Sequence, residues 1–173
     1  MTGIHRIAIT GPESTGKTWL AEQLARHYNT RWIAEYSREF LMKSQGKYSY
    51  DDILIIAREQ DRRNRTTPEG SQKFIFCDTE LLVTYVWCQY KYGKCHPWIT
   101  EQLPHQPFSL YLLPDTELPW SYDPLRENPH EREELLSIYR NELDRLNLPW
   151  EWVRGEGQQR LQSAVAAIEK YFG

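Results

Sequence analysis

The residues that point most directly to chemistry are eight consecutive positions near the N-terminus, Gly-Pro-Glu-Ser-Thr-Gly-Lys-Thr at 11–18. They fit the pattern G-x-x-x-x-G-K-[ST], in which glycines let the backbone turn so that successive N–H groups face phosphate oxygens. In such a loop the ammonium of Lys17 reaches the β- and γ-phosphates of ATP, and the hydroxyl of Thr18 is placed to hold Mg²⁺. The residues expected to bind the nucleotide are Gly11, Glu13, Ser14, Thr15, Gly16, Lys17 and Thr18.

The segments on either side of this loop favour a phosphate site over a plain surface turn. An apolar run at 4–10 leads directly into the loop, as a buried strand would. After the loop, Leu20, Leu24 and Tyr28 recur at the spacing of one helix face. The motif requires a strand, a loop and a helix in this order, because the helix N-terminus adds a favourable dipole to the N–H groups of the loop.

A carboxylate is expected opposite the loop. Asp78 follows the apolar run at 73–77, and ligands of open parallel sheets bind at the carboxyl ends of the strands. We therefore predict that Asp78 and Thr18 hold Mg²⁺, with Asp78 acting directly or through water. The alternative is that Asp78 caps the helix that follows, and the two roles can coexist.

Charged residues of both signs follow the second expected strand. Glu35 closes that strand, and Arg38 and Glu39 follow within about one helical turn. A carboxylate here could take the proton of an acceptor hydroxyl, so Glu35 is a candidate general base; Asp78 is the other candidate. Arg126, from a proline-rich segment, is a candidate to fold over the phosphates and stabilise charge during transfer. Surface salt bridges and a solvated arginine are the alternatives.

Alternating strand and helix patterns predict the fold. The strands are expected at 4–10, 31–34, 73–77, 109–113 and 150–153. Further helices are expected at about 36–43, 51–65, 79–90, 135–146 and 161–172. Parallel strands need crossover connections, so helices should cover both faces of the sheet. We therefore predict a three-layer α/β fold of the P-loop NTPase and nucleoside-kinase type, as one domain over 1–173 with an irregular lid at about 114–130.

Composition and charge exclude several classes of protein. The net charge is −3 at neutral pH, so no nucleic-acid partner is expected. No run approaches the roughly 18 apolar residues of a membrane helix, and no signal-peptide pattern opens the chain, so we expect a cytoplasmic protein without membrane contact. The three cysteines do not suggest a disulfide framework, and Cys88 with Cys95 and His96 lacks a fourth ligand at zinc-like spacing. The oligomeric state is left open.

Further segments complete a set of ordered motifs. Besides the loop, they are Glu-Tyr-Ser-Arg-Glu-Phe at 35–40, Phe-Cys-Asp-Thr at 76–79, Gly-Lys-Cys-His-Pro-Trp at 93–98 and Trp-Ser-Tyr-Asp-Pro-Leu-Arg at 120–126. Over nearly the whole chain, these motifs resemble the ribosylnicotinamide kinase domain of NadR-type proteins of NAD biosynthesis. The resemblance implies a kinase that moves the γ-phosphate of ATP onto the 5′-hydroxyl of nicotinamide riboside, giving nicotinamide mononucleotide. A small nucleoside-like acceptor is therefore the expected partner.

The resemblance also implies which residues bind the acceptor. We expect these to be Glu35, Tyr36, Arg38, Trp98 and Asp123. Trp98, Trp120 and Tyr122 lie near the expected mouth of the site, where a flat ring could stack on one of them; ordinary packing is the alternative. Proteins of this kind carry a separate adenylyltransferase domain with an H-x-G-H-type motif, which is absent here, so adenylyl transfer is not expected of this chain.

Other proteins with the same loop fit less well. A regulatory GTPase needs an N/T-K-x-D segment and a D-x-x-G switch, and a transporter ATPase needs a Ser-Gly-Gly signature; neither set is visible. An oligomeric AAA-type motor needs a hydrophobic run that ends in Asp-Glu, whereas Asp78 is followed by Thr79. Two alternatives stay open. One is a P-loop kinase for another nucleoside or metabolite, since Ala34 stands where the family has a ring-stacking aromatic residue. The other is a non-enzymatic ATP-binding sensor, in which Glu35 would be dispensable.

Overall fold

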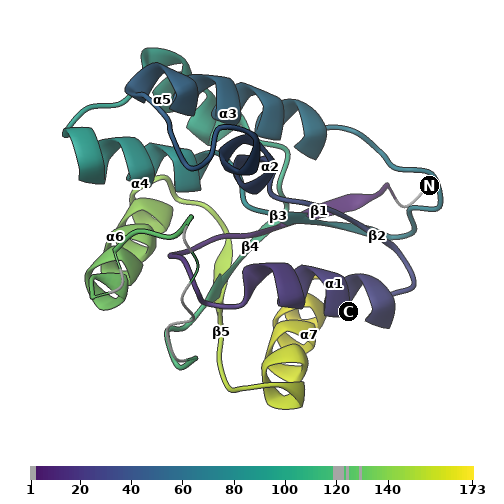
Figure 1. Cartoon of the computed structure of the whole chain (residues 1–173). Coiled ribbons are helices and arrows are strands. Elements are labelled where there is room, and N and C mark those ends of the chain that lie inside the picture. Colours follow the sequence, from purple (N-terminus) through teal and green to yellow (C-terminus); the bar gives the residue numbers. More distant parts are fainter. Residues whose placement is uncertain (1–2, 119–122, 124, 129) are drawn as a thin grey trace.

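A parallel sheet forms the centre of the molecule (Figure 1). The computed structural model describes residues 3–118, 123, 125–128 and 130–173. The five strands are β1 (His5–Ile9), β2 (Arg31–Ile33), β3 (Phe74–Asp78), β4 (Leu110–Pro114) and β5 (Trp150–Val153). Their order across the sheet is β2-β3-β1-β4-β5, and every neighbouring pair is parallel. Each strand lies within one residue of a predicted segment, so the predicted α/β class is confirmed.

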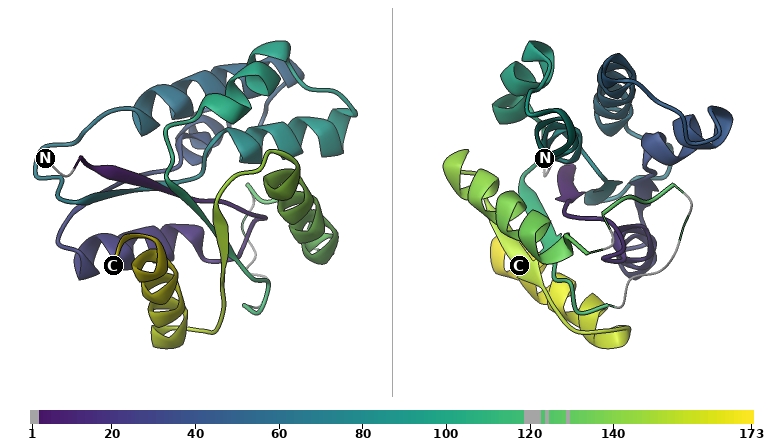
Figure 2. Two further views of the ribbon diagram at one scale, coloured as in Figure 1. Left: turned by 180° about the vertical axis from the view of Figure 1, so that it is seen from behind. Right: turned by 60° about the vertical axis from the view of Figure 1, so that its left-hand side comes forward.

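Helices cover both faces of the sheet, as two further views show (Figure 2). One face packs against α1 (Lys17–His27) and α7 (Gln158–Phe172). The other face packs against α3 (Tyr50–Asn64), α4 (Leu81–Tyr92), α5 (Pro97–Gln102), the 3-10 turn η1 (Leu103–His105) and α6 (Arg132–Arg145). The short helix α2 (Tyr36–Lys43) lies beside α3. In the described part of the chain, none of the helices has the length and apolar character that crossing a membrane requires.

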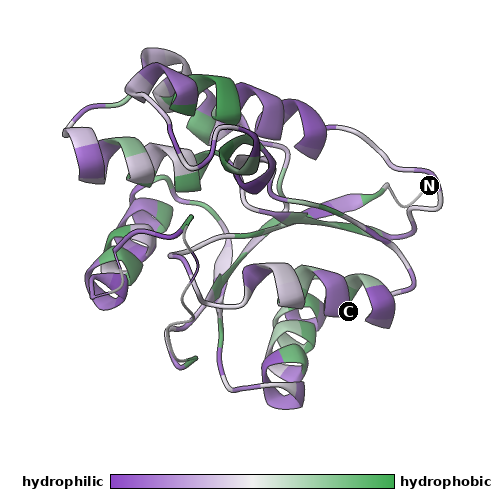
Figure 3. Cartoon of the chain, in the orientation of Figure 1, coloured by the Kyte–Doolittle hydropathy of each residue, from purple (hydrophilic) through white to green (hydrophobic). Residues whose placement is uncertain are grey.

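The two cores follow from the alternation of side chains along each strand. Ile7 and Ile9 of β1 belong to the core beneath α1 and α7, whereas Ala8 belongs to the core beneath α3 and α4. Successive strand residues point to opposite faces, so a strand that is buried on both sides is apolar throughout. Hydrophobic residues accordingly mark the central strands, while hydrophilic residues mark the outer surfaces of several helices (Figure 3). Both layers of helices are therefore held to the sheet by apolar burial.

One pair of elements was not predicted. The residues between α4 and β4 form α5 and η1, in a stretch for which no element was predicted. Pro97 occupies the first turn of α5, a position that tolerates its missing N–H, and Ile99 is wholly buried. A helix of six residues is too short to produce a periodic pattern in the sequence. The predicted lid at about 114–130 is irregular beyond β4, since its described residues after Pro114 form neither helix nor strand.

Candidate functional site

The predicted phosphate loop joins β1 to α1 and depends on its two glycines. Gly11 and Gly16 have φ angles of 130° and 77°, which favour glycine over other residues. A Cβ atom on Gly11 would lie 3.1 Å from Leu113 Cδ1, and one on Gly16 would lie 3.0 Å from Leu118 Cδ1. The loop therefore has both the backbone shape and the close packing that the sequence pattern implies.

The ammonium of Lys17 folds back over the loop. Its Nζ donates to the carbonyl oxygens of Gly11 and Pro12, at 2.9 Å each, while the Thr15 hydroxyl donates to the Pro12 oxygen at 2.9 Å. The carbonyl of Thr15 accepts a 2.7 Å bond from the guanidinium of Arg160, a residue that is completely buried. Arg160 was not predicted as part of the site, and it ties the loop to α7.

Thr18 and Asp78 meet below the loop. The Thr18 hydroxyl donates to Asp78 Oδ2 at 2.6 Å, and Asp78 is only 1% exposed. Burial, and then the negative charge of Glu35, raise the pKa of Asp78, while the hydrogen bond from Thr18 and the charge of Lys17 act in the opposite direction. The two predicted magnesium ligands are thus brought together, and Glu35 is a second carboxylate nearby.

Asp78 does not cap the following helix, because Glu80 does. Its carboxylate accepts from the backbone N–H of Leu82 at 2.8 Å, from the Thr10 hydroxyl at 2.6 Å and from Gln106 Nε2 at 2.7 Å. Glu80 is wholly buried, which raises its pKa against these hydrogen bonds. Sequence reasoning missed this residue, although an acidic group directly before an apolar helix is an N-terminal signal.

Glu35 lies at the start of α2 and lines the same cavity as the loop. Its Oε1 accepts a hydrogen bond from the Ser37 hydroxyl. Arg38 also lines the cavity and forms a 2.9 Å ion pair with Asp123. The N–H of Leu125 and then the guanidinium of Arg38 hold the pKa of Asp123 below its usual value.

Tyr36 and Trp98, both expected to bind the acceptor, are not among the residues that line the cavity. The Tyr36 ring packs 4.5 Å from the guanidinium carbon of Arg63. The Trp98 ring, on α5, lies 5.3 Å from the guanidinium carbon of Arg58. Trp120 and Tyr122 lie outside the described residues.

The segment 125–128 lies against the phosphate loop. Arg126 Nη1 donates to the Ser14 hydroxyl at 3.3 Å, and the N–H of Glu127 donates to Glu13 Oε2 at 3.0 Å. Arg132, at the start of α6, donates to the Ser14 carbonyl at 3.0 Å. Arg126 therefore lies against the phosphate loop, and so does Arg132, which the sequence did not single out.

The carboxylate of Glu13 is largely withdrawn from water. Burial raises its pKa to about 7, although the charge of Lys17 and the hydrogen bond from the Glu127 N–H lower it. Because the segment 125–128 hydrogen-bonds to this carboxylate, its ionisation is coupled to the packing of that segment on the loop.

A cavity of about 650 Å³ is lined by the phosphate loop together with Glu35, Arg38 and Arg126. Part of its lining is an aromatic wall, which we define as Tyr48, Trp87 and Tyr90. Trp87 Nε1 donates to the Tyr48 hydroxyl at 3.1 Å, and the two rings meet edge to face with centroids 4.7 Å apart. The Tyr48 hydroxyl donates to Glu127 Oε1 at 2.6 Å. Val83, Trp87 and Tyr90 recur at the spacing of one helix face, which is the signal that sequence reasoning did not use.

A glycine-containing phosphate loop at the carboxyl edge of this parallel sheet, with the Thr18–Asp78 pair beside it, defines a P-loop domain of the nucleoside-kinase fold type. A protein-family model described as "AAA domain" matches residues 6–160, and the chain belongs to this family. The chain lacks the Asp-Glu pair that an oligomeric AAA-type motor needs after its hydrophobic run, since Asp78 is followed by Thr79, and membership of the family does not by itself assign that role.

NadR and thymidylate kinase are among the proteins that are similar to this chain. The chain is 28% identical over 172 residues to the trifunctional NAD biosynthesis/regulator protein NadR of Escherichia coli (strain K12), a match that covers 96% of this chain and 42% of that protein. A crystal structure of NadR protein in complex with NR superposes with a TM-score of 0.85 at 23% identity, covering 97% of this chain and 51% of the other. Thymidylate kinase from Ehrlichia chaffeensis superposes with a TM-score of 0.67 at 14% identity, covering 97% and 98%. The chain thus spans about half the length of the NadR proteins it matches.

Proposed function

We propose that this chain is an ATP-dependent kinase that transfers the γ-phosphoryl group of ATP to the 5′-hydroxyl of nicotinamide riboside. The observation that carries the proposal is that Lys17, Glu35 and the aromatic wall line the same cavity. A nucleoside kinase needs a phosphate cradle, a group that takes the proton of the hydroxyl and a flat surface for the base. The similarity to NadR, a protein named for NAD biosynthesis and crystallised with NR, supports nicotinamide riboside as the acceptor.

The cationic end of the cavity would hold the phosphates of ATP. The loop and the first two residues of α1, Lys17 and Thr18, line this end, and α1 has no acidic residue in its first turn. The ammonium of Lys17 would exchange its carbonyl partners for β- and γ-phosphate oxygens. Arg126, which contacts Ser14 of the loop, would stabilise the charge that develops on the transferred group.

The donor set beside the loop fits Mg²⁺. Thr18 and Asp78 supply hard oxygen ligands, and Mg²⁺ is typically held by one or two carboxylates together with phosphates and waters. Among the described residues there is no group of three or more His, Cys, Asp and Glu side chains that could hold a metal without such help. When bound, Mg²⁺ would neutralise charge on the β- and γ-phosphates. A cation would also offset the cost of ionising the buried Asp78 carboxylate.

Glu35 is the better placed of the two candidate bases. It lines the cavity, and the Ser37 hydroxyl orients its carboxylate. Asp78 is almost completely buried and already engaged by Thr18. We therefore assign to Glu35 the removal of the proton from the acceptor hydroxyl, and to Asp78 the magnesium site.

The aromatic wall is the proposed site of the acceptor ring. Tyr48 and Trp87 present rings whose mutual orientation is fixed by their hydrogen bond, and Tyr90 lies one turn further along α4. The nicotinamide ring of the riboside is flat and positively charged, so aromatic faces would attract it by stacking and by cation–π interaction. This wall would supply the ring contact that Ala34 does not.

The direct test is to supply ATP, Mg²⁺ and nicotinamide riboside and to look for nicotinamide mononucleotide by mass spectrometry, with ADP release followed in parallel. Thymidine, adenosine and uridine serve as competing acceptors. We expect nicotinamide riboside to give the highest kcat/KM. Rapid ADP release with another nucleoside, and none with nicotinamide riboside, would show that the acceptor is wrong. Tight ATP binding without transfer to any acceptor would favour the sensor.

A further inference from the structure

Two buried carboxamides on α3 lie outside the reaction described above. Gln60 and Asn64 are one helical turn apart, and each is only 1% exposed. Burying an amide is costly unless its polar atoms are hydrogen-bonded. The partners of these side chains therefore indicate what the two residues do.

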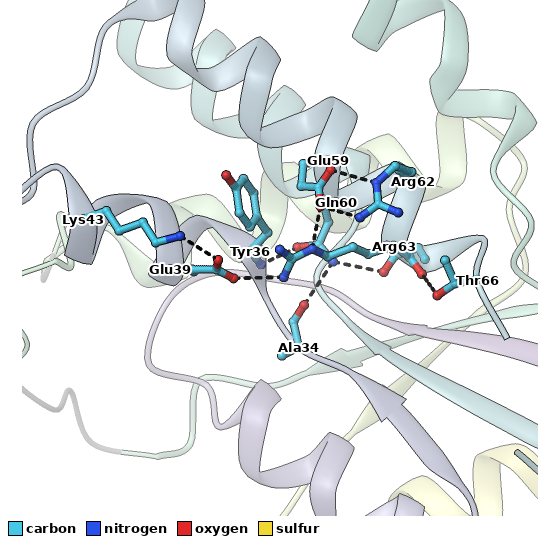
Figure 4. Close-up of polar contacts among 10 residues, drawn as sticks. Ala34, Tyr36, Glu39, Lys43, Glu59, Gln60, Arg62, Arg63 and Thr66 are labelled. Atoms are coloured by element: carbon cyan, nitrogen blue, oxygen red, sulfur yellow. Dashed lines mark hydrogen bonds and ion pairs between the residues drawn. The ribbon is translucent and has the colours of Figure 1, made fainter. Parts of the chain in front are cut away.

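Gln60 holds the backbone on both sides of Glu35 (Figure 4). Its Oε1 accepts from the N–H of Tyr36 at 2.7 Å, and its Nε2 donates to the carbonyl of Ala34 at 3.3 Å. The hydrogen-bonded ladder between β2 and β3 ends with the pair Ile33 and Cys77. The backbone that carries Glu35 thus continues beyond the sheet, where Gln60 supplies bonds that the ladder no longer provides.

Because of the same contact, the side chain of Glu35 is not needed to cap α2. Glu35 is the N-cap residue of α2, but its side chain makes no capping hydrogen bond. The first N–H groups of a helix have no partner within the helix, and Gln60 satisfies the one that belongs to Tyr36. The carboxylate of Glu35 can therefore face the cavity.

Asn64 extends the connection to the next strand. Its Oδ1 accepts from Gln60 Nε2 at 3.0 Å, and its Nδ2 donates to the carbonyl of Thr79 at 3.0 Å. Thr79 directly follows Asp78 and has a φ angle of 79°, a conformation that is uncommon outside glycine. A continuous chain of hydrogen bonds thus joins the end of β2, with Glu35, to the end of β3, with Asp78.

We infer that Gln60 and Asn64 are positioning residues that fix the carboxylate of Glu35 relative to Asp78. The inference rests on the proposed function, in which Glu35 takes the proton and Asp78 belongs to the magnesium site. Gln60 acts through Glu35, and Asn64 acts through Gln60 and the backbone at Thr79. Two carboxylates that repel each other need such a restraint, because displacement by about 1 Å can cost on the order of 100-fold in rate.

The first test replaces Gln60 by methionine, which has a similar length and no amide. We expect Gln60→Met to lower kcat by roughly 10- to 100-fold, while the Kd for Mg·ATP stays within about twofold, since the phosphate loop keeps its contacts. Gln162→Met, at an exposed position of α7, is the matched control, and its kcat should equal that of the parent. A parent-like kcat in folded Gln60→Met would overturn the inference.

A double-mutant cycle separates positioning from a general structural role. If Gln60 acts through Glu35, then Gln60→Met should slow the parent but have little further effect in a Glu35→Gln background. Equal rate losses in both backgrounds would overturn the inference. If Glu35→Gln alone retains parent-like turnover, the assignment of the base is wrong, and the positioning role for Glu35 is overturned with it.

Amide hydrogen exchange gives a readout that does not need turnover. In Gln60→Met the N–H of Tyr36 should exchange at least about tenfold faster, while amides of β3 keep their protection. Unchanged exchange at Tyr36, or a loss of protection throughout the sheet, would contradict the inference whether or not the kinase activity is found. Should Gln60→Met fail to fold, Asn64→Asp provides the same kinetic test, because it keeps the acceptor for Gln60 and loses the donor to Thr79; parent-like kcat there would also overturn the inference.

Discussion

The buried carboxylate of Glu13 should make the stability of the protein depend on pH. Burial raises the pKa of this group from 4.5 to about 7 in the folded chain. Between these values the folded state binds the proton more tightly than the unfolded state, so the free energy of unfolding falls as pH rises. The destabilising contribution is absent well below pH 4.5 and complete above about pH 7.

The size of the effect follows from the shift. The difference between about 7 and 4.5 is about 2.5 units, which corresponds to about 3 kcal/mol when fully expressed. Between pH 5 and pH 8 the expressed part is about 2–3 kcal/mol. Glu13→Gln removes the charge and keeps a side-chain oxygen to accept from the N–H of Glu127, so at pH 8, where the effect is complete, it should be more stable than the parent by about 3 kcal/mol.

The assay is urea denaturation of the parent and of Glu13→Gln at a series of pH values from 5 to 8. The difference between the two curves isolates Glu13 from the other groups that titrate. Glu101→Gln, at an exposed position of α5, is the control, and its difference from the parent should stay within about 0.5 kcal/mol. If the stability difference between the parent and Glu13→Gln does not grow with pH, burial does not raise the pKa of Glu13 in the folded protein, and the reasoning is refuted.

Three further predictions concern the proposed reaction. Lys17→Ala should leave the circular dichroism spectrum unchanged but slow turnover by the equivalent of about 3 kcal/mol of lost transition-state stabilisation, because Lys17 would face the transferred phosphoryl group. Turnover within twofold of the parent would show that Lys17 is not part of the site. Asp78→Asn should raise the Mg²⁺ concentration for half-maximal activity, since an amide is a poorer ligand for a hard cation, and an unchanged Mg²⁺ titration would show that Asp78 does not serve the metal. Trp87→Leu should raise KM for the acceptor by up to about tenfold through the loss of roughly 0.5–1.5 kcal/mol of stacking, with the KM for ATP unchanged; a change confined to ATP would relocate the acceptor.

Much of the architecture could be predicted because its signals are local. The loop at 11–18 is recognisable from the spacing of its glycines, lysine and threonine, and the apolar run before Asp78 predicts β3. Both signals depend on residues within one element and its immediate neighbours. The helices α5 and η1 escaped prediction because six and three residues do not establish a period.

The cap of α4 shows where local reasoning reached its limit. Asp78 and Glu80 are both acidic residues before a helix, and the sequence left open whether Asp78 capped it. The fold separates the two: Asp78 points to Thr18, and Glu80 turns into a pocket made by Thr10 and Gln106. Partners that lie tens of residues away along the chain decide the outcome.

The sequence by itself determined the phosphate loop, the carboxylates that follow the expected strands and the α/β class, since each follows from short-range spacing and alternation. Only the tertiary structure decided which aromatic residues border the cavity, bringing Trp87 to it and placing Trp98 against Arg58. It likewise brought Arg160 to the carbonyl of Thr15 across 145 positions of sequence. The physical reason is that such contacts arise from the packing of whole helices on the sheet. This packing cannot be predicted from the periodicity of residues within one helix.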